Sequence, residues 1–125
     1  METLKKILAI DDNLMLLELF QKMLSPQYDI QVATSASTAL NFLNSHKVDV
    51  ILLDIEMPNI SGFDFLYDIR KIPSYMTVPI IIVSGNSGQD YLVKARSSSA
   101  ADVLIKPVKK ELLIETIEKA ISAAK

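Results

Sequence analysis

Short runs of apolar residues alternate along the chain with longer segments in which apolar residues recur at helical spacing. The five apolar runs are typical of buried β-strands and comprise residues 7–10, 30–33, 48–53, 79–83 and 103–105. The segments after them have helical periodicity and comprise residues 14–24, 35–44, 63–70, 89–98 and 110–123. The pattern therefore predicts strands and helices in regular alternation, with Ser35 as the N-cap of the second helix.

This alternation predicts one parallel sheet. The connections are too long for hairpins, so successive strands are expected to pair through βαβ units. The strands are continuously apolar rather than alternating, which indicates helices on both faces of the sheet. We therefore expect an α/β fold, with a doubly wound five-stranded parallel sheet and five helices, in a single domain over residues 1–125. Residues 57–62 are predicted to form a loop.

Chemically reactive side chains follow four of the five predicted strands. Asp11 and Asp12 follow the first strand, Asp54 the third, Ser84 the fourth and Lys106 the fifth. In open parallel sheets, ligands bind beyond the carboxyl ends of the strands. Each residue taken alone would pass for a helix cap, a turn residue or a surface lysine. Their combination at one edge of the sheet predicts a functional site.

The three aspartates of this edge predict a cation site. Carboxylates packed together raise one another's pKa unless a cation joins them, and Lys106 supplies only one positive charge. The chain has no cysteine, and its one histidine, His46, lies in a polar segment and is expected to be solvated. Oxygen ligands favour a hard divalent ion, above all Mg²⁺. Such a site suits a phosphoryl group, which an aspartate can accept as an aspartyl-phosphate.

The overall composition excludes several classes of function. The 13 Lys and Arg against 15 Asp and Glu give a net charge of −2, which provides no basic field for direct nucleic-acid binding. No apolar run is long enough for a membrane span, and the first residues lack the form of a signal peptide. We therefore expect a cytoplasmic protein. The absence of cysteine excludes disulfides, thiolate metal sites and a cysteine nucleophile.

The order and spacing of these residues resemble the receiver domain of two-component response regulators over essentially the whole chain. The resemblance is carried by the acidic pair in Ile7–Asn13, by Asp54-Ile55-Glu56-Met57-Pro58 with Gly62 eight residues after Asp54, by Ser84, and by Lys106-Pro107. It implies a flavodoxin-like fold with strand order 2-1-3-4-5. It also implies a signalling module, not an enzyme acting on a separate substrate, which takes a phosphoryl group from a phosphohistidine, changes conformation and slowly dephosphorylates itself.

The resemblance implies a role for each site residue. Asp54 is expected to be the phosphoacceptor, Lys106 to pair with the phosphoryl group, and Ser84 to donate a hydrogen bond to it and to move when it arrives. Asp12 is expected to bind Mg²⁺ directly and Asp11 largely through water. The full set of expected metal ligands is Asp11, Asp12, Asp54 and the main-chain carbonyl of Glu56. The Lys106-Pro107 peptide bond is expected to be cis.

Three further positions bear on signalling. Family members usually carry Tyr or Phe three residues before the lysine, where this chain has Val103, so transmission through an aromatic rotamer there is in question. Glu56 and Asn86 occupy the two positions at which, as the resemblance implies, the lifetime of the phosphoryl group is tuned. Tyr91 lies in a polar helix and is expected to be mostly solvated.

The first helix is expected to carry the partner surface. On a helical wheel, the core-facing stripe comprises Leu16, Leu19, Phe20, Met23 and Leu24. Leu14, Met15 and Leu17 fall outside this stripe, beside Asp12. The resemblance suggests that they dock a sensor histidine kinase or a histidine phosphotransfer protein. It also admits a homodimer that forms on phosphorylation.

Three alternatives remain open. A Mg²⁺-dependent phosphohydrolase of the haloacid dehalogenase type would have its nucleophile in a DxD motif after the first strand, whereas the two aspartates here are adjacent. A nucleotide- or flavin-binding module would need a glycine-rich phosphate loop, and the chain has only Gly62, Gly85 and Gly88. A pseudo-receiver that is never phosphorylated is the third, and the complete set of site residues argues against it.

Overall fold

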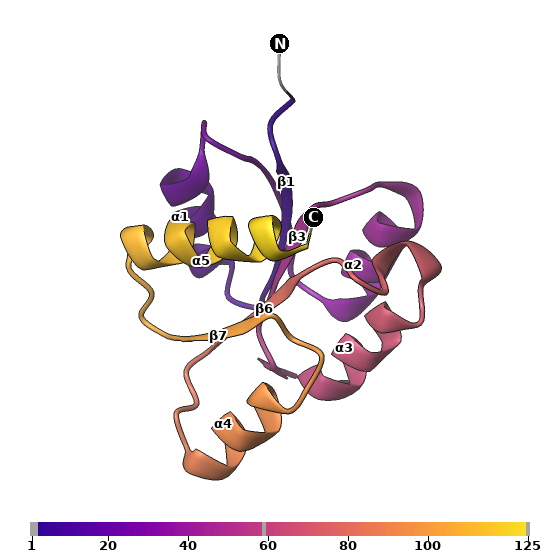
Figure 1. The fold of residues 1–125 in the computed structure, drawn as a ribbon, viewed down its shortest axis with the longest axis vertical. Coiled ribbons are helices and arrows are strands. Elements are labelled where there is room, and N and C mark those ends of the chain that lie inside the picture. The colour runs from indigo at the N-terminus through magenta and orange to yellow at the C-terminus, as the bar shows by residue number, and fades with distance from the viewer. Residues whose placement is uncertain (1–2, 59, 125) are drawn as a thin grey trace.

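A five-stranded parallel sheet forms the centre of the molecule, which the computed structural model describes over residues 3–58 and 60–124 (Figure 1). Its strands are β1 (Lys6–Ile10), β2 (Asp29–Ala33), β3 (Val50–Leu53), β6 (Ile80–Ser84) and β7 (Asp102–Ile105). They lie in the order β2-β1-β3-β6-β7, which is the predicted order 2-1-3-4-5. All five predicted strands are confirmed, and their ends shift by at most two residues.

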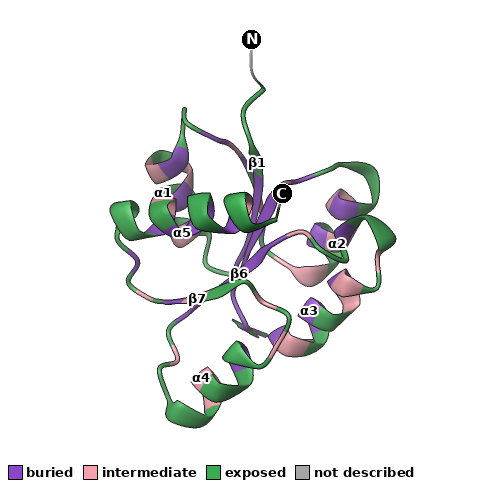
Figure 2. Ribbon diagram, viewed as in Figure 1, coloured by how far each residue is buried: buried purple, intermediate pink, exposed green. Residues whose placement is uncertain are grey.

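Five helices cover the two faces of this sheet. They are α1 (Leu14–Leu24), α2 (Ala36–Ser45), α3 (Gly62–Arg70), α4 (Gln89–Arg96) and α5 (Lys110–Ala123). Helices α1 and α5 pack on one face, and α2, α3 and α4 pack on the other (Figure 1). Figure 2 shows the strands largely buried between two layers of helices whose outer sides are exposed. The doubly wound α/β fold is therefore confirmed.

The strands contribute alternate residues to two separate cores. Ile7 and Ala9 of β1 face α1 and α5, whereas Leu8 and Ile10 face the α2–α4 side. Both faces of each central strand are buried, which explains why its sequence is continuously apolar. Side chains cap the N-termini of the first two helices. Asn13 accepts a hydrogen bond from the Leu16 N–H, and Ser35 accepts one from the Thr38 N–H, as predicted.

Two short elements were not predicted. In place of the predicted loop over residues 57–62, β4 (Glu56–Met57) pairs antiparallel with β5 (Ile60–Ser61), while Asn59 lies outside the described residues. A 3₁₀ turn, η1 (Pro73–Tyr75), precedes β6. The two strands have two residues each and the turn has three, so they are too short to show a hydrophobic period.

The burial of α1 corrects the predicted helical wheel. Leu17 is fully buried at 0% exposure and Leu19 is 45% exposed, which is the reverse of the prediction. Helix α1 packs against α5 as well as the sheet, and Leu17 shares a core cluster with Leu113 and Ile117 of α5. This second contact turns the buried stripe of α1 toward Leu17 and leaves Leu19 outside.

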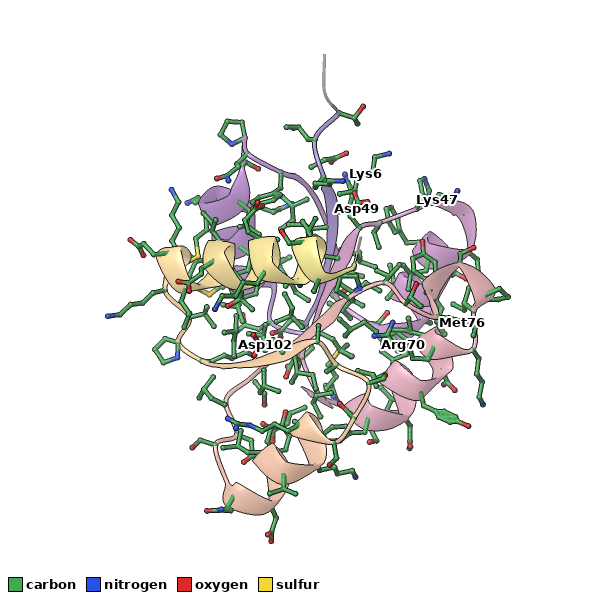
Figure 3. The ribbon with its side chains drawn as sticks, in the orientation of Figure 1. Lys6, Lys47, Asp49, Arg70, Met76 and Asp102 are labelled. Carbon is green, nitrogen blue, oxygen red and sulfur yellow. The ribbon has the colours of Figure 1, made fainter. Side chains whose placement is uncertain are left out.

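The amino ends of the strands are tied together by side-chain hydrogen bonds. Arg70, at the end of α3, donates to the carbonyl of Tyr75 at 2.9 Å and to the carbonyl of Ser99 at 2.9 Å, which joins the segments before β6 and β7. Asp49 accepts from the Lys6 N–H at 2.7 Å. Figure 3 shows Asp49 next to Lys6 at the start of β1, and Arg70 near α3. The carboxyl edge, with its reactive side chains, is the opposite one.

Over the described ranges 3–58 and 60–124, no helix combines the length and the hydropathy that crossing a membrane requires.

Candidate functional site

The carboxyl edge of the sheet gathers the three predicted carboxylates. Asp11 directly follows β1 and Asp54 directly follows β3, and these strands are neighbours. The Asp54 N–H donates to the Ile10 carbonyl at 2.9 Å, which holds Asp54 beside the end of β1. Carboxylate oxygens of Asp11, Asp12 and Asp54 lie within 4.8 Å of one another. Asp11 and Asp54 are 2% and 4% exposed, whereas Asp12 is exposed to solvent.

Lys106 reaches into this cluster from the end of β7. Its Nζ lies 2.9 Å from Asp11 Oδ2 and 3.5 Å from Asp54 Oδ2. The main-chain N–H of Lys106 donates to the Ser84 carbonyl at 2.8 Å. The Lys106-Pro107 peptide bond is cis, as the resemblance implied. Burial acts to lower the pKa of Lys106, but the ion pairs with Asp11 and Asp54 outweigh it and the pKa is raised. The lysine therefore stays a cation at neutral pH.

Asp54 is held in an environment that disfavours its negative charge. Burial raises the pKa of Asp54, and the charge of Asp11 raises it further. The Glu56 N–H, which donates to Asp54 Oδ1 at 3.0 Å, and the Lys106 ammonium oppose this rise without cancelling it. With three carboxylates and one ammonium, the site has an excess of negative charge that a divalent cation would relieve.

Ser84 ends β6 and lies fully buried beside this cluster. Its hydroxyl donates to Glu56 Oε1 at 3.1 Å and accepts from the Asn86 N–H at 3.2 Å. The side chain of Glu56 is therefore engaged with Ser84, a contact that the sequence did not predict. A phosphoryl group on Asp54 would compete with Glu56 for the single hydroxyl proton of Ser84.

Gly62, the glycine of the sequence motif, has a steric role next to Asp54. Its N–H donates to the Ile55 carbonyl at 3.0 Å, and this bond closes the β4-β5 hairpin onto the loop that carries Asp54. A Cβ atom at Gly62 would lie 2.3 Å from Ile55 Cα and 2.4 Å from the Ile55 carbonyl oxygen. Only a residue without a side chain fits this close approach.

Tyr91 is a site neighbour that sequence reasoning missed. Its side chain is half-buried rather than solvated, and its ring packs against Phe63 with the ring centroids 5.8 Å apart. Ser84, Glu56 and Asp54 lie close enough to the Tyr91 hydroxyl group to affect its pKa. No local pattern could have indicated this, because α4 is polar in sequence and Tyr91 reaches the site only through tertiary packing.

The structure corrects one residue of the predicted partner surface beside Asp12. Leu14 and Met15 are exposed as predicted, at 54% and 80%. The prediction that Leu17 belongs to this surface is wrong, since it lies in the core against α5. Leu19 is exposed in its place, so the apolar patch of α1 consists of Leu14, Met15 and Leu19.

Comparison with known proteins identifies the family. A family model described as the response regulator receiver domain matches residues 7–118. The two-component response regulator ARR10 of Arabidopsis thaliana is 34% identical over 111 residues, which cover 86% of this chain and 20% of that protein. The luminescence regulatory protein LuxO of Vibrio campbellii is 32% identical over 116 residues, covering 92% and 25%. The chain thus spans about a fifth to a quarter of the length of these relatives.

Solved structures agree with this match. The receiver domain of a Francisella response regulator is 27% identical with a TM-score of 0.85, over 97% of this chain and 99% of that one. The receiver domain of a Pseudomonas aeruginosa sensor histidine kinase, whose structure has a magnesium ion coordinated in the active-site cleft, is 25% identical with a TM-score of 0.86, over 96% and 99%. The chain belongs to the family of response regulator receiver domains, which are the phosphoacceptor signalling modules of two-component systems.

Proposed function

We propose that residues 1–125 form a single receiver domain that accepts a phosphoryl group on Asp54 in a Mg²⁺-dependent reaction. The observation that carries this proposal is the convergence of three carboxylates within 4.8 Å, with the Lys106 ammonium 2.9 Å from one of them and 3.5 Å from another. A buried carboxylate whose pKa is raised by burial and by Asp11 is a proton acceptor or nucleophile in a site short of positive charge.

The residues of the site fit Mg²⁺. The cluster offers only oxygen atoms, and its charge excess matches a hard divalent cation. We assign Asp11, Asp12, Asp54 and the main-chain carbonyl of Glu56 as its ligands. Bound there, the ion would shield the carboxylates from one another and attract phosphoryl oxygens. The magnesium ion in the related Pseudomonas aeruginosa receiver domain supports this assignment.

The remaining chemistry belongs to side chains of this chain. A carboxylate oxygen of Asp54 attacks the phosphorus atom of a phosphohistidine, so that a P–O bond forms while the P–N bond breaks. The electron pair of the P–N bond stays with the imidazole, and a proton on the other ring nitrogen lets the ring leave as neutral imidazole. The Lys106 ammonium pairs with the phosphoryl oxygens, and the Ser84 hydroxyl turns from Glu56 to donate to one of them.

Labelling of the wild-type chain tests this proposal. Incubation with acetyl phosphate and Mg²⁺ is expected to add the mass of one phosphoryl group, in an acid-stable and hydroxylamine-sensitive linkage that peptide mapping assigns to Asp54. EDTA is expected to prevent the adduct. An adduct on another residue would overturn the assignment to Asp54, and the absence of any adduct would favour the pseudo-receiver. Sustained turnover of a generic phosphate ester would favour the phosphohydrolase instead.

We place the phosphodonor on the apolar patch of α1. Receiver domains work with sensor kinases in two-component systems, and this patch, which is Leu14, Met15 and Leu19, begins two residues after Asp12. An exposed apolar surface beside the acceptor would seat the helices of a sensor histidine kinase or a histidine phosphotransfer protein. We also propose a cytoplasmic location for the chain, where we expect it to meet such a donor. A homodimer formed on phosphorylation stays a prediction.

Replacing the three patch residues by glutamine is expected to slow phosphotransfer from such a donor by at least about tenfold. Labelling by acetyl phosphate should be unchanged, because this small donor needs no docking surface. Rates are measured by loss of phosphate from the donor protein. The matched control is Val93→Gln with Met76→Gln, which alters two apolar residues of similar exposure away from α1. Equal phosphotransfer rates in patch variant and wild type would rule out this surface.

A further inference from the structure

The hydroxyl group of Tyr91 is buried beside the candidate site. Its Oη has no partner among the residues that the structure describes. Leaving a buried hydroxyl unpaired costs free energy, so such groups are rare in folded proteins. The ring is fixed by its contact with Phe63 and by the core cluster of the α2–α4 face, so the oxygen cannot turn to solvent without repacking. An unpaired donor is therefore held in a defined place.

This hydroxyl faces the candidate site. The Ser84 hydroxyl lies near Tyr91 Oη without meeting it in hydrogen-bond geometry, and Glu56, Asp54 and Lys106 lie close enough for their charges to affect the pKa of Tyr91. Burial raises the pKa of Tyr91, and the two carboxylates raise it further, so the phenol keeps its proton at neutral pH. Tyr91 is thus a hydrogen-bond donor whose neighbours are residues of the phosphoacceptor site.

Ser84 has one unused acceptor position. A hydroxyl has one proton to donate and two lone pairs that accept. The Ser84 proton is directed at Glu56 Oε1, 3.1 Å away, and one lone pair accepts from the Asn86 N–H at 3.2 Å. The second lone pair remains. It becomes a better acceptor when the Ser84 proton is engaged by a strongly negative oxygen, because hydrogen bonds in a chain polarise one another.

We propose that Tyr91 is a positioning residue for Ser84 in the phosphorylated state, where its hydroxyl donates to Ser84 Oγ while Ser84 donates to the phosphoryl group. This inference rests on the proposed phosphorylation of Asp54. The Ser84 proton leaves Glu56 for a phosphoryl oxygen, and Tyr91 gains the partner that it lacks in the unphosphorylated form. The chain of hydrogen bonds runs from Asp54 into the first turn of α4, although Val103 occupies the position at which the family usually has an aromatic residue.

A double-mutant cycle with beryllofluoride and Mg²⁺ tests this role. The affinity of the wild-type chain for this phosphoryl mimic is compared with those of Tyr91→Phe, Ser84→Ala and the double variant, by titration of NMR signals. Tyr91→Phe is expected to weaken binding about threefold to tenfold, the value of one hydrogen bond. In the Ser84→Ala background it is expected to have no effect. Tyr67→Phe, which alters an exposed tyrosine of α3, is the matched control and should bind like wild type.

Two further readouts separate this role from a merely structural one. Tyr91→Phe removes a hydroxyl without a partner, so the Tm of the unmodified protein should not fall. In protein containing fluorotyrosine, the ¹⁹F signal of Tyr91 is expected to shift with saturating beryllofluoride in the wild-type chain and much less in Ser84→Ala. Equal losses of affinity in both backgrounds, or no loss in either, would overturn the inference. If wild-type protein forms no Asp54 adduct, the proposed function itself fails.

Discussion

Replacing Asp54 by asparagine is expected to abolish acceptance of a phosphoryl group, with a loss of rate of at least about a thousandfold. The amide oxygen of asparagine is a poor nucleophile and cannot form the acyl phosphate. The variant should fold, because its Oδ1 can still accept the Glu56 N–H and because the substitution removes a buried charge that Asp11 repels. Intact mass after incubation with acetyl phosphate and Mg²⁺ measures the loss.

Lys106→Met is a second test of the same site. It keeps the acceptor but removes the ammonium that lies 2.9 Å from Asp11 and 3.5 Å from Asp54, so the rate is expected to fall about a hundredfold to a thousandfold. Asp64→Asn and Lys109→Met, which alter exposed residues of the same types, should leave labelling unchanged. An Asp54→Asn protein that is still labelled at the wild-type rate would show that the acceptor is another residue.

Replacing Gly62 by alanine is expected to lower the free energy of unfolding by about 3 kcal/mol. The new Cβ would lie 2.3 Å from Ile55 Cα, and the backbone on both sides would have to shift because no flexible side chain can yield. The shift would strain the bond from the Gly62 N–H to the Ile55 carbonyl and would move the residue that follows Asp54. Urea unfolding measures the stability, and acetyl-phosphate labelling should slow in parallel.

Gly85→Ala provides the control for this effect. A Cβ at Gly85 meets no atom within 4 Å, so its introduction should change the unfolding free energy far less. If the two alanine variants were equally stable, the close approach between Gly62 and Ile55 would not be a determinant of stability.

The hydrophobic pattern was sufficient to predict the sheet and its covering helices. Strand β3 illustrates the reason, since its four residues Val50–Leu53 are all buried and all apolar. Helices α1 and α5 begin and end at the predicted residues. Because parallel strands deliver the residues that follow them to one edge, the convergence of Asp11, Asp54 and Lys106 could also be predicted. Their individual roles came from the family resemblance and stay predictions.

Other features depend on contacts between distant segments. Leu17 and Leu19 are chemically identical and lie at opposite edges of the apolar side of α1, and the packing of α1 against α5 buries Leu17 while Leu19 stays exposed. The hydroxyl of Tyr91 is buried beside Ser84 because α4 packs against Phe63 of α3, although the sequence of α4 is polar. Local periodicity reports which side of a helix is apolar, but it carries no information on a second neighbour.

The sequence by itself determined the order of the elements, the parallel sheet and the reactive residues at its carboxyl edge. These follow from local patterns and from the direction that a parallel strand imposes on the residue after it. The tertiary structure decided which leucines of α1 remain exposed, why Gly62 can carry no side chain, and that Tyr91 reaches Ser84. Each of these depends on the distance between residues far apart in the chain, which folding sets and no local pattern encodes.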